Sequence, residues 1–265
     1  MKWLVGGAAL TALVAAAPAT GSELSGAAAP IYNQHGFYNW NGFYIGLNGG
    51  GHWSNVSDPA IITSNTFWIA NNIAIMSAAL PLKSNAYGFA GGGQAGYNWL
   101  VSSFVLGLEA DIMALSGMPT RTLTVPWTNP AQHATLSDSG NDRWMATFRG
   151  RVGYAFDRVL FYVTGGGAAA NRSVSHAYSD NFGAGTPLTT AQVTQTRYGW
   201  TVGGGVEFAM WNNWAVRAEY LFANLGTIDS VLVFQNTPGK GATIAHADAL
   251  TESVARAAVS YKLGR

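Results

Sequence analysis

Hydrophobic and polar residues alternate along eight stretches of this chain, which together run from residue 41 to residue 263. A period of two is typical of β-strands that present one apolar face and one polar face. The pattern predicts strands at 41–53, 85–99, 104–115, 142–156, 159–177, 196–211, 214–225 and 250–263.

The connections between these strands alternate in length. Three are tight turns, at 100–103, 157–158 and 212–213. Four are long, at 54–84, 116–141, 178–195 and 226–249. Short turns on one side and long loops on the other are typical of barrels in bacterial outer membranes, with the short turns in the periplasm. The chain is therefore predicted to be all-β: an eight-stranded antiparallel up-and-down transmembrane β-barrel with its long loops on the cell surface.

The two faces of each strand indicate which side meets lipid. In the stretch 142–156, Phe148 and Val152 share one face, whereas Arg149 and Arg151 lie on the other. A charged side chain facing lipid at mid-depth costs about 2–4 kcal/mol, so the charged face is expected to line the lumen. A soluble β-sandwich would show the same alternation.

Aromatic residues distinguish the membrane barrel from the sandwich, because they gather at strand ends at two depths, as membrane girdles do. The girdle residues predicted from this position are Trp40, Trp53, Trp99, Trp144, Trp200, Trp211, Trp214 and Tyr261.

Composition agrees with this prediction. Only 10% of the 265 residues are charged, against about 25% in soluble domains, and there are 33 Gly and 10 Trp. The net charge of +1 offers no long-range attraction for nucleic acid. The absence of cysteine excludes disulfides and thiolate metal sites. The N-terminus resembles a secretory signal peptide. We therefore expect a signal peptide at 1–19, a flexible periplasmic segment at 20–39 and the barrel at 40–265.

Charged residues on the predicted luminal faces form the densest chemical cluster in the sequence. Five acids and five arginines are expected in a luminal ion-pair network: Glu109, Asp111, Arg149, Arg151, Arg197, Glu207, Arg217, Glu219, Glu252 and Arg256. An eight-stranded barrel is just wide enough for its interior side chains to fill it, which favours a plug of ion pairs. A narrow ion path, or a gate that exchanges partners, is the alternative.

Other candidate sites are weaker. The string Gly91-x-Gly93-x-x-Gly96 continues as a strand instead of opening a helix, so no nucleotide cofactor is expected. None of the five histidines has a metal-binding spacing, so no metal is expected. His176, Ser179 and Asp180 could form an acyl-transfer site of a lipid-modifying enzyme. The uncharged stretch 59–82 could be a helix packed on the loops, with Ile69, Ile73, Met76 and Leu80 on one face, or a surface that touches lipopolysaccharide or a partner.

Several strand motifs resemble those of a known group. The motif at 40–46 (WNGFYIG) is similar to the opening strand of small outer-membrane β-barrel surface proteins of alphaproteobacteria, often described as porin-family or outer-membrane immunogenic proteins. The motifs at 92–99, 149–155, 202–207 and 217–220 resemble their second, fourth, sixth and seventh strands. The resemblance implies an OmpA-like eight-stranded barrel without catalytic residues.

These observations together predict a non-enzymatic surface antigen of the outer membrane that contributes to envelope integrity. A small porin-like channel for ions or solutes is the rival, and a lipid-modifying enzyme is the third possibility. The expected partners are membrane lipid and lipopolysaccharide, the barrel-assembly machinery and a surface ligand bound by the four loops. No nucleic acid or cofactor is expected.

Overall fold

The computed structural model describes residues 38–57, 60–64, 70–80, 84–117, 121–181, 189–211, 213–237 and 240–263. The predicted signal peptide and nearly all of the segment 20–39 lie outside the described residues, so both stay predictions. No helix in the described part of the chain is long and apolar enough to cross a bilayer.

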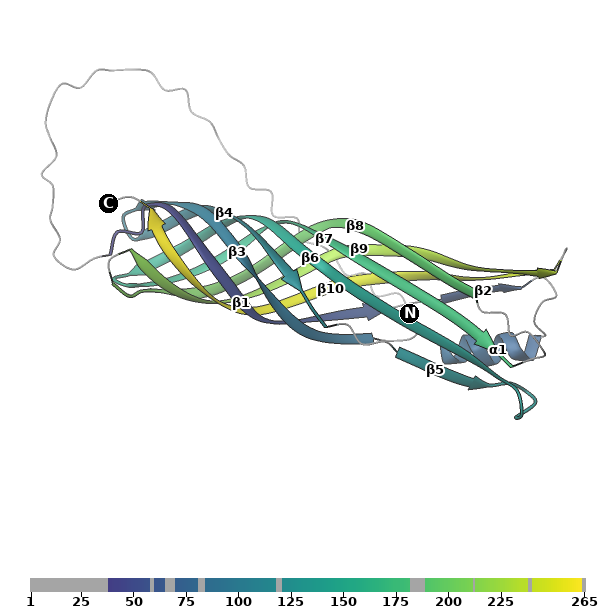
Figure 1. Ribbon diagram of the computed structural model, residues 1–265. Helices are drawn as coiled ribbons and strands as arrows, with labels where there is room; N and C mark the ends of the chain where they lie inside the picture. The colour runs from purple at the N-terminus through teal and green to yellow at the C-terminus, as the bar shows by residue number, and fades with distance from the viewer. Residues whose placement is uncertain are drawn as a thin grey trace, which may run out of the picture. The chain divides into compact units, whose positions relative to one another are not determined.

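Eight long strands form one closed antiparallel sheet (Figure 1). They are β1 (Gly42–Ser57), β3 (Ser84–Val101), β4 (Phe104–Leu115), β6 (His133–Phe156), β7 (Val159–Asp180), β8 (Thr189–Ala209), β9 (Trp214–Thr237) and β10 (Lys240–Leu263). Each pairs with the next along the chain, and β10 pairs back onto β1 from Phe43–Leu263 to Ser57–Ala249. Closure leaves no unpaired edge facing lipid, which a spanning sheet requires. The predicted eight-stranded barrel is confirmed.

The strand faces follow the predicted alternation. Along β4, exposed and buried residues alternate at every position from Phe104 to Leu115. On β6, the Phe148 side chain is 62% exposed, whereas its neighbour Arg149 is fully buried. In a membrane-spanning wall, the exposed apolar row is the one that lipid covers, because the closed sheet has no other apolar face to bury.

Seven of the eight predicted girdle residues are exposed or half-buried on the barrel wall: Trp53, Trp99, Trp144, Trp200, Trp211, Trp214 and Tyr261. The exception is Trp40, which is only 3% exposed. Its indole Nε1 donates a hydrogen bond to the backbone oxygen of Asp157, at 3.2 Å. Trp40 packs inside the turn end of the barrel, so its assignment to a girdle was wrong. It precedes the first strand, where alternation no longer dictates the side to which a side chain points.

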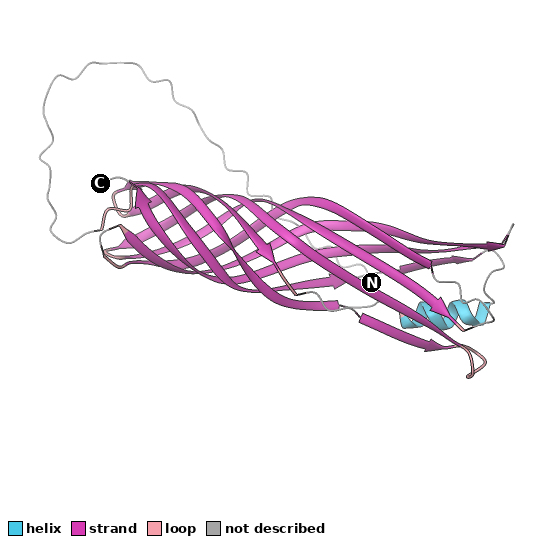
Figure 2. Cartoon of the chain, in the orientation of Figure 1, coloured by secondary structure: helices cyan, strands magenta, loops and turns pink. Residues whose placement is uncertain are grey.

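The strands extend far beyond the length needed to cross a bilayer, which is about 9–11 residues. β6, β9 and β10 each contain 24 residues. The predicted long loops at 116–141, 178–195 and 226–249 are therefore largely strand (Figure 2), and this part of the prediction was wrong. Outside the membrane the outer face of a strand meets water, so it becomes polar and its sequence resembles a loop.

Beyond the barrel the sheet divides into two walls. We call the end of the barrel that carries the tight turns its base and the opposite end its upper end. One wall contains β5 (Arg121–Pro126) and the upper parts of β6, β7 and β8. The other contains the upper parts of β9 and β10 together with β2 (Ala60–Ser64). We call these two walls, with the helix α1 (Ala70–Ala79), the head.

The head has a hydrophobic core of its own, contributed by both walls and α1: Met76, Leu80, Val125, Trp127, Ala134, Leu136, Tyr178, Leu232 and Ile244. Ile73 lies partly buried against it. The helix in the stretch 59–82 therefore packs against the other surface segments, which confirms the first of the two readings of this stretch. Ile69 lies outside the described residues.

Candidate functional site: the filled lumen

Arg149 lies at the centre of the lumen and contacts three carboxylates from two other strands. Its guanidinium donates to Glu109 Oε1 at 2.6 Å, to Asp111 Oδ2 at 2.8 Å and to Glu219 Oε1 at 3.1 Å. Glu109 and Asp111 come from β4 and Glu219 from β9, so this one side chain ties opposite sides of the barrel together. The planar guanidinium suits such a position because its donors are fixed in a fork that can bridge several acceptors.

Three further arginines complete the cluster. Arg217 donates to Glu109 Oε2 at 2.6 Å, and Arg151 donates to Glu207 Oε2 at 2.9 Å. Arg256 Nε donates to Glu219 Oε2 at 2.7 Å, and its Nη1 donates to Asp111 Oδ1 at 3.2 Å. All eight side chains are buried. We call them the ion-pair cluster: Glu109, Asp111, Arg149, Arg151, Glu207, Arg217, Glu219 and Arg256. Four acids face four arginines, so the cluster carries no formal net charge.

Two residues predicted for this network lie apart from it. Glu252 accepts from His52 Nδ1 at 2.6 Å and belongs to a separate pair between β10 and β1. Arg197 is half-buried on β8, opposite Ala170 of β7, and no ion pair joins it to the cluster within the described residues. On β6, Arg143 shares the luminal parity of Arg149 in the sequence but is exposed. The register shifts between Asp142 and Trp144, and this bulge turns Arg143 away from the lumen.

The sequence prediction missed two tyrosines that complete the cluster. Tyr44 donates to Glu109 Oε2 at 2.5 Å, and Tyr162 donates to Glu219 Oε1 at 2.8 Å. The Arg151 guanidinium lies 4.6 Å from the centre of the Tyr162 ring, within cation–π range. Strand parity could have identified Tyr44, since it shares the inward face of β1 with Asn48 and His52. The prediction of the network considered only charged residues, so neither tyrosine was included.

Buried apolar side chains gather in the lumen on both sides of the ion-pair cluster. Toward the turns lies a base layer formed by Trp40, Val105, Leu160, Tyr162, Ala209 and Ala215. Toward the head lies an upper layer that includes Met113, Leu115, Met145, Leu221, Leu225, Leu250 and Val254.

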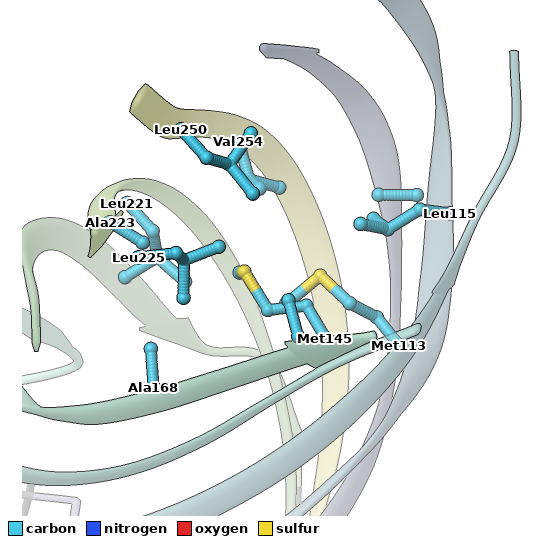
Figure 3. Packing of buried hydrophobic residues seen from close by; sticks show 11 residues of the cluster. Met113, Leu115, Met145, Ala168, Leu221, Ala223, Leu225, Leu250 and Val254 are labelled. Carbon is cyan, nitrogen blue, oxygen red and sulfur yellow. The ribbon is translucent and has the colours of Figure 1, made fainter. Parts of the chain in front are cut away.

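Figure 3 shows the side chains of this upper layer gathered inside the sheet, with Met113 and Met145 on paired positions of β4 and β6. Along β9 the order is Ala215 in the base layer, Arg217 and Glu219 in the cluster, Leu221 in the upper layer and Leu232 in the head core. The lumen is therefore filled by buried side chains from the base layer to the head.

The suggested acyl-transfer grouping does not assemble. His176 and Asp180 are buried on the inner face of β7, whereas Ser179 alternates to the opposite face. His176 Nδ1 is instead 2.8 Å from Asp138 Oδ1, and its ring stacks on that of His246 with centroids 4.1 Å apart. Among the described side chains, no group of three or more histidines or acids is arranged to hold a metal ion.

Sequence comparisons agree with this architecture. The chain is 34% identical over 193 residues to a 31 kDa outer-membrane immunogenic protein of Brucella melitensis, which covers 71% of this chain and 72% of the relative. It is 31% identical over 148 residues to a 22 kDa outer membrane protein of Rhizobium leguminosarum bv. viciae, covering 55% of this chain and 56% of the relative.

Among solved structures, Neisserial surface protein A aligns with 83% of this chain and 97% of its own, at 15% identity and a TM-score of 0.36. Because this score is low, the assignment rests on sequence. A family model described as the outer membrane protein beta-barrel domain matches residues 6–262. The chain therefore belongs to the outer-membrane β-barrel protein family and resides in the bacterial outer membrane.

Proposed function

We propose that this protein is a closed, non-enzymatic barrel that holds a folded head at the cell surface and contributes to the integrity of the envelope. The observation that carries the proposal is the filled lumen, in which an apolar base layer, the neutral ion-pair cluster and an apolar upper layer follow one another. A lumen filled in this way is suited to anchoring, because buried side chains occupy the space that a pore would need. The head core gives the anchored part a fixed shape.

Conductance of the refolded protein in planar bilayers tests the closed state. Wild type is expected to give little or no steady conductance, because the interior side chains of an eight-stranded barrel fill its lumen. A stable, ion-selective conductance that Glu109→Gln or Glu219→Gln alters would instead establish the small porin-like channel. The matched control is Arg143→Gln, which changes an exposed charge outside the lumen.

The role in the envelope is tested in cells. A strain of the native bacterium without the gene is expected to become more sensitive to detergent, and the wild-type gene is expected to restore resistance. Unchanged resistance in the deletion strain would reject the envelope role. We expect no turnover of labelled phospholipid or lipopolysaccharide by the purified barrel, because His176, Ser179 and Asp180 do not assemble into a site. Turnover of either lipid would reject the non-enzymatic assignment.

A further inference from the structure

The upper parts of β8 and β9 present two strand edges that no described strand covers. The two strands are paired from Ala209–Ala215 up to Trp200–Asn224, and then both continue without each other. Above this level β8 pairs with β7 and β9 pairs with β10. We call these two edges, residues 189–199 of β8 and 227–237 of β9, the notch. It separates the two walls of the head.

The divergence of the two strands is built into the backbone. Gly226, just beyond the last pair, has a φ of +75°, a left-handed conformation that favours glycine. Its N–H donates to the side chain of Asn224 at 3.0 Å. The β9–β10 register shifts at the same level, between Ala249 and Thr251. On the other strand, a Cβ on Gly199 would collide with the backbone oxygen of Asn224, so the strands meet closely at this point before separating.

The notch opens just above the outer aromatic girdle. Trp200 lies in the last pair, opposite Asn224, and Phe222 lies two residues before Asn224 on β9; the ring centroids of Trp200 and Phe222 are 5.7 Å apart. Aromatic rings of this kind mark the membrane–water interface. The unpaired edges therefore face the aqueous side of the outer membrane, where peptide groups can exchange water for another partner.

The outer part of the β8 edge, before Arg197, lacks the features that usually protect strand edges. Residues 189–196 read TTAQVTQT, without a charge, a proline or a glycine. Native edges are commonly shortened or carry charges, prolines or bulges, because an open edge templates pairing with another chain. Two other edge strands of the head follow that rule, since β2 has only five residues and β5 begins at Arg121 and ends at Pro126.

The β8 edge is also held in place before any partner arrives. Its opposite edge pairs with β7 from Tyr178–Thr189 downward, and Ala191 packs against the head core. On the other face, Thr190, Gln192 and Thr194 are exposed. A strand fixed in this way loses little conformational entropy on binding, which favours strand addition.

We propose that the notch receives an extended, uncharged peptide segment of another protein, added as a strand to β8. This proposal rests on the surface role proposed above. Only a peptide backbone offers donors and acceptors in the repeat that a strand edge requires. Threonine and valine along β8 favour β-branched residues in the partner. A neighbouring copy is a poorer fit, because its β8 edge is already fixed to its own β7 and cannot adjust its twist as a free peptide can.

The test uses the full-length barrel in lipid nanodiscs, with a library of displayed heptapeptides as the probe. Recovered peptides are expected to be uncharged and rich in Thr, Val and Ile. Gln192→Lys/Thr194→Lys, which places charges beside the β8 edge, should weaken their binding about tenfold or more. The control Thr122→Lys/Thr124→Lys adds the same charges to exposed positions of β5 and should leave binding unchanged. Hydrogen exchange should slow at residues 189–199 when the peptide is bound.

Three results would overturn the proposal. These are recovery of no peptide above empty nanodiscs, equal binding to the wild type and the lysine variant, and exchange protection outside the notch. Dimers cross-linked through Thr194→Cys without any peptide would show that a second copy covers the edge instead. Because binding is read on purified protein, it is independent of detergent resistance in cells, so the envelope role and the notch can fail separately.

Discussion

Replacing Arg149, which is fully buried, with methionine should strongly destabilise the barrel. Arg149→Met keeps most of the side-chain volume but removes three charge-assisted contacts, to Glu109, Asp111 and Glu219. The cluster then holds four acids and three arginines in a buried site. Breaking a buried ion pair by removing one partner typically costs about 3–5 kcal/mol, because the remaining charge is stranded. We expect a loss of that size in the free energy of unfolding.

The structure indicates which carboxylate is stranded. Glu109 keeps Arg217 at 2.6 Å, and Glu219 keeps Arg256 at 2.7 Å. Asp111 keeps only the longer contacts to Arg256, at 3.2 and 3.3 Å, and the hydroxyl of Thr147. Adding Asp111→Asn to Arg149→Met should therefore recover about 1 kcal/mol or more of the lost stability, measured as a coupling energy between the two sites.

The measurement is reversible urea unfolding of the barrel in lipid vesicles, followed by tryptophan fluorescence, with m-values compared between variants. Arg143→Met is the control, because it removes an exposed arginine from the same strand and should change stability by less than about 0.5 kcal/mol. If Arg149→Met unfolds within about 1 kcal/mol of wild type, or if Asp111→Asn gives no recovery, the cluster is not what holds the barrel closed.

Three further predictions address the lipid face of the barrel, the base layer and the head. Phe148→Arg, on the lipid face, should cost about 2–4 kcal/mol of folding free energy in vesicles, whereas Tyr154→Arg, nearer the turns, should cost about 0–1; equal losses would disprove the assigned depth. Trp40→Ala empties a buried site in the base layer and should cost about 3–5 kcal/mol in the same unfolding assay, and a negligible loss would remove Trp40 from the core. Met76→Asp should expose the head to protease while the barrel keeps its heat-modifiable gel migration, because a buried unpaired charge disrupts only the core that contains it; retained protease resistance would contradict this.

The sequence alone determined the barrel, its strands and the faces of those strands. Alternation is a local property, and the cost of placing a charge such as Arg149 or Glu109 in lipid depends only on the side of the strand that carries it. The position of Phe148 on the outside and of Arg151, Glu207 and Arg217 on the inside followed without knowledge of any partner. The membrane location followed for the same reason.

The alternation of hydrophobic and polar residues gave wrong predictions where a strand passes from lipid into water along its length. The upper parts of β6, β7, β9 and β10 leave the bilayer, so their outer faces become polar and the sequence was interpreted as loops. One inserted residue at the bulge near Arg143 reversed the parity above it, and no local pattern encodes such an insertion. Trp40 could not be assigned a side, since it precedes the first paired residue.

Only the tertiary structure decided which charges meet. Arg149 comes from β6, whereas its partners come from β4 and β9. These side chains lie at the same level in the lumen only because of the registers of all the strand pairs between them. The same summation leaves Glu252 with His52 and Arg197 outside the cluster, although all three lie on strands whose faces were assigned correctly. Registers between strands depend on turns, bulges and closure together, so contacts across the lumen are a property of the whole barrel and not of any segment.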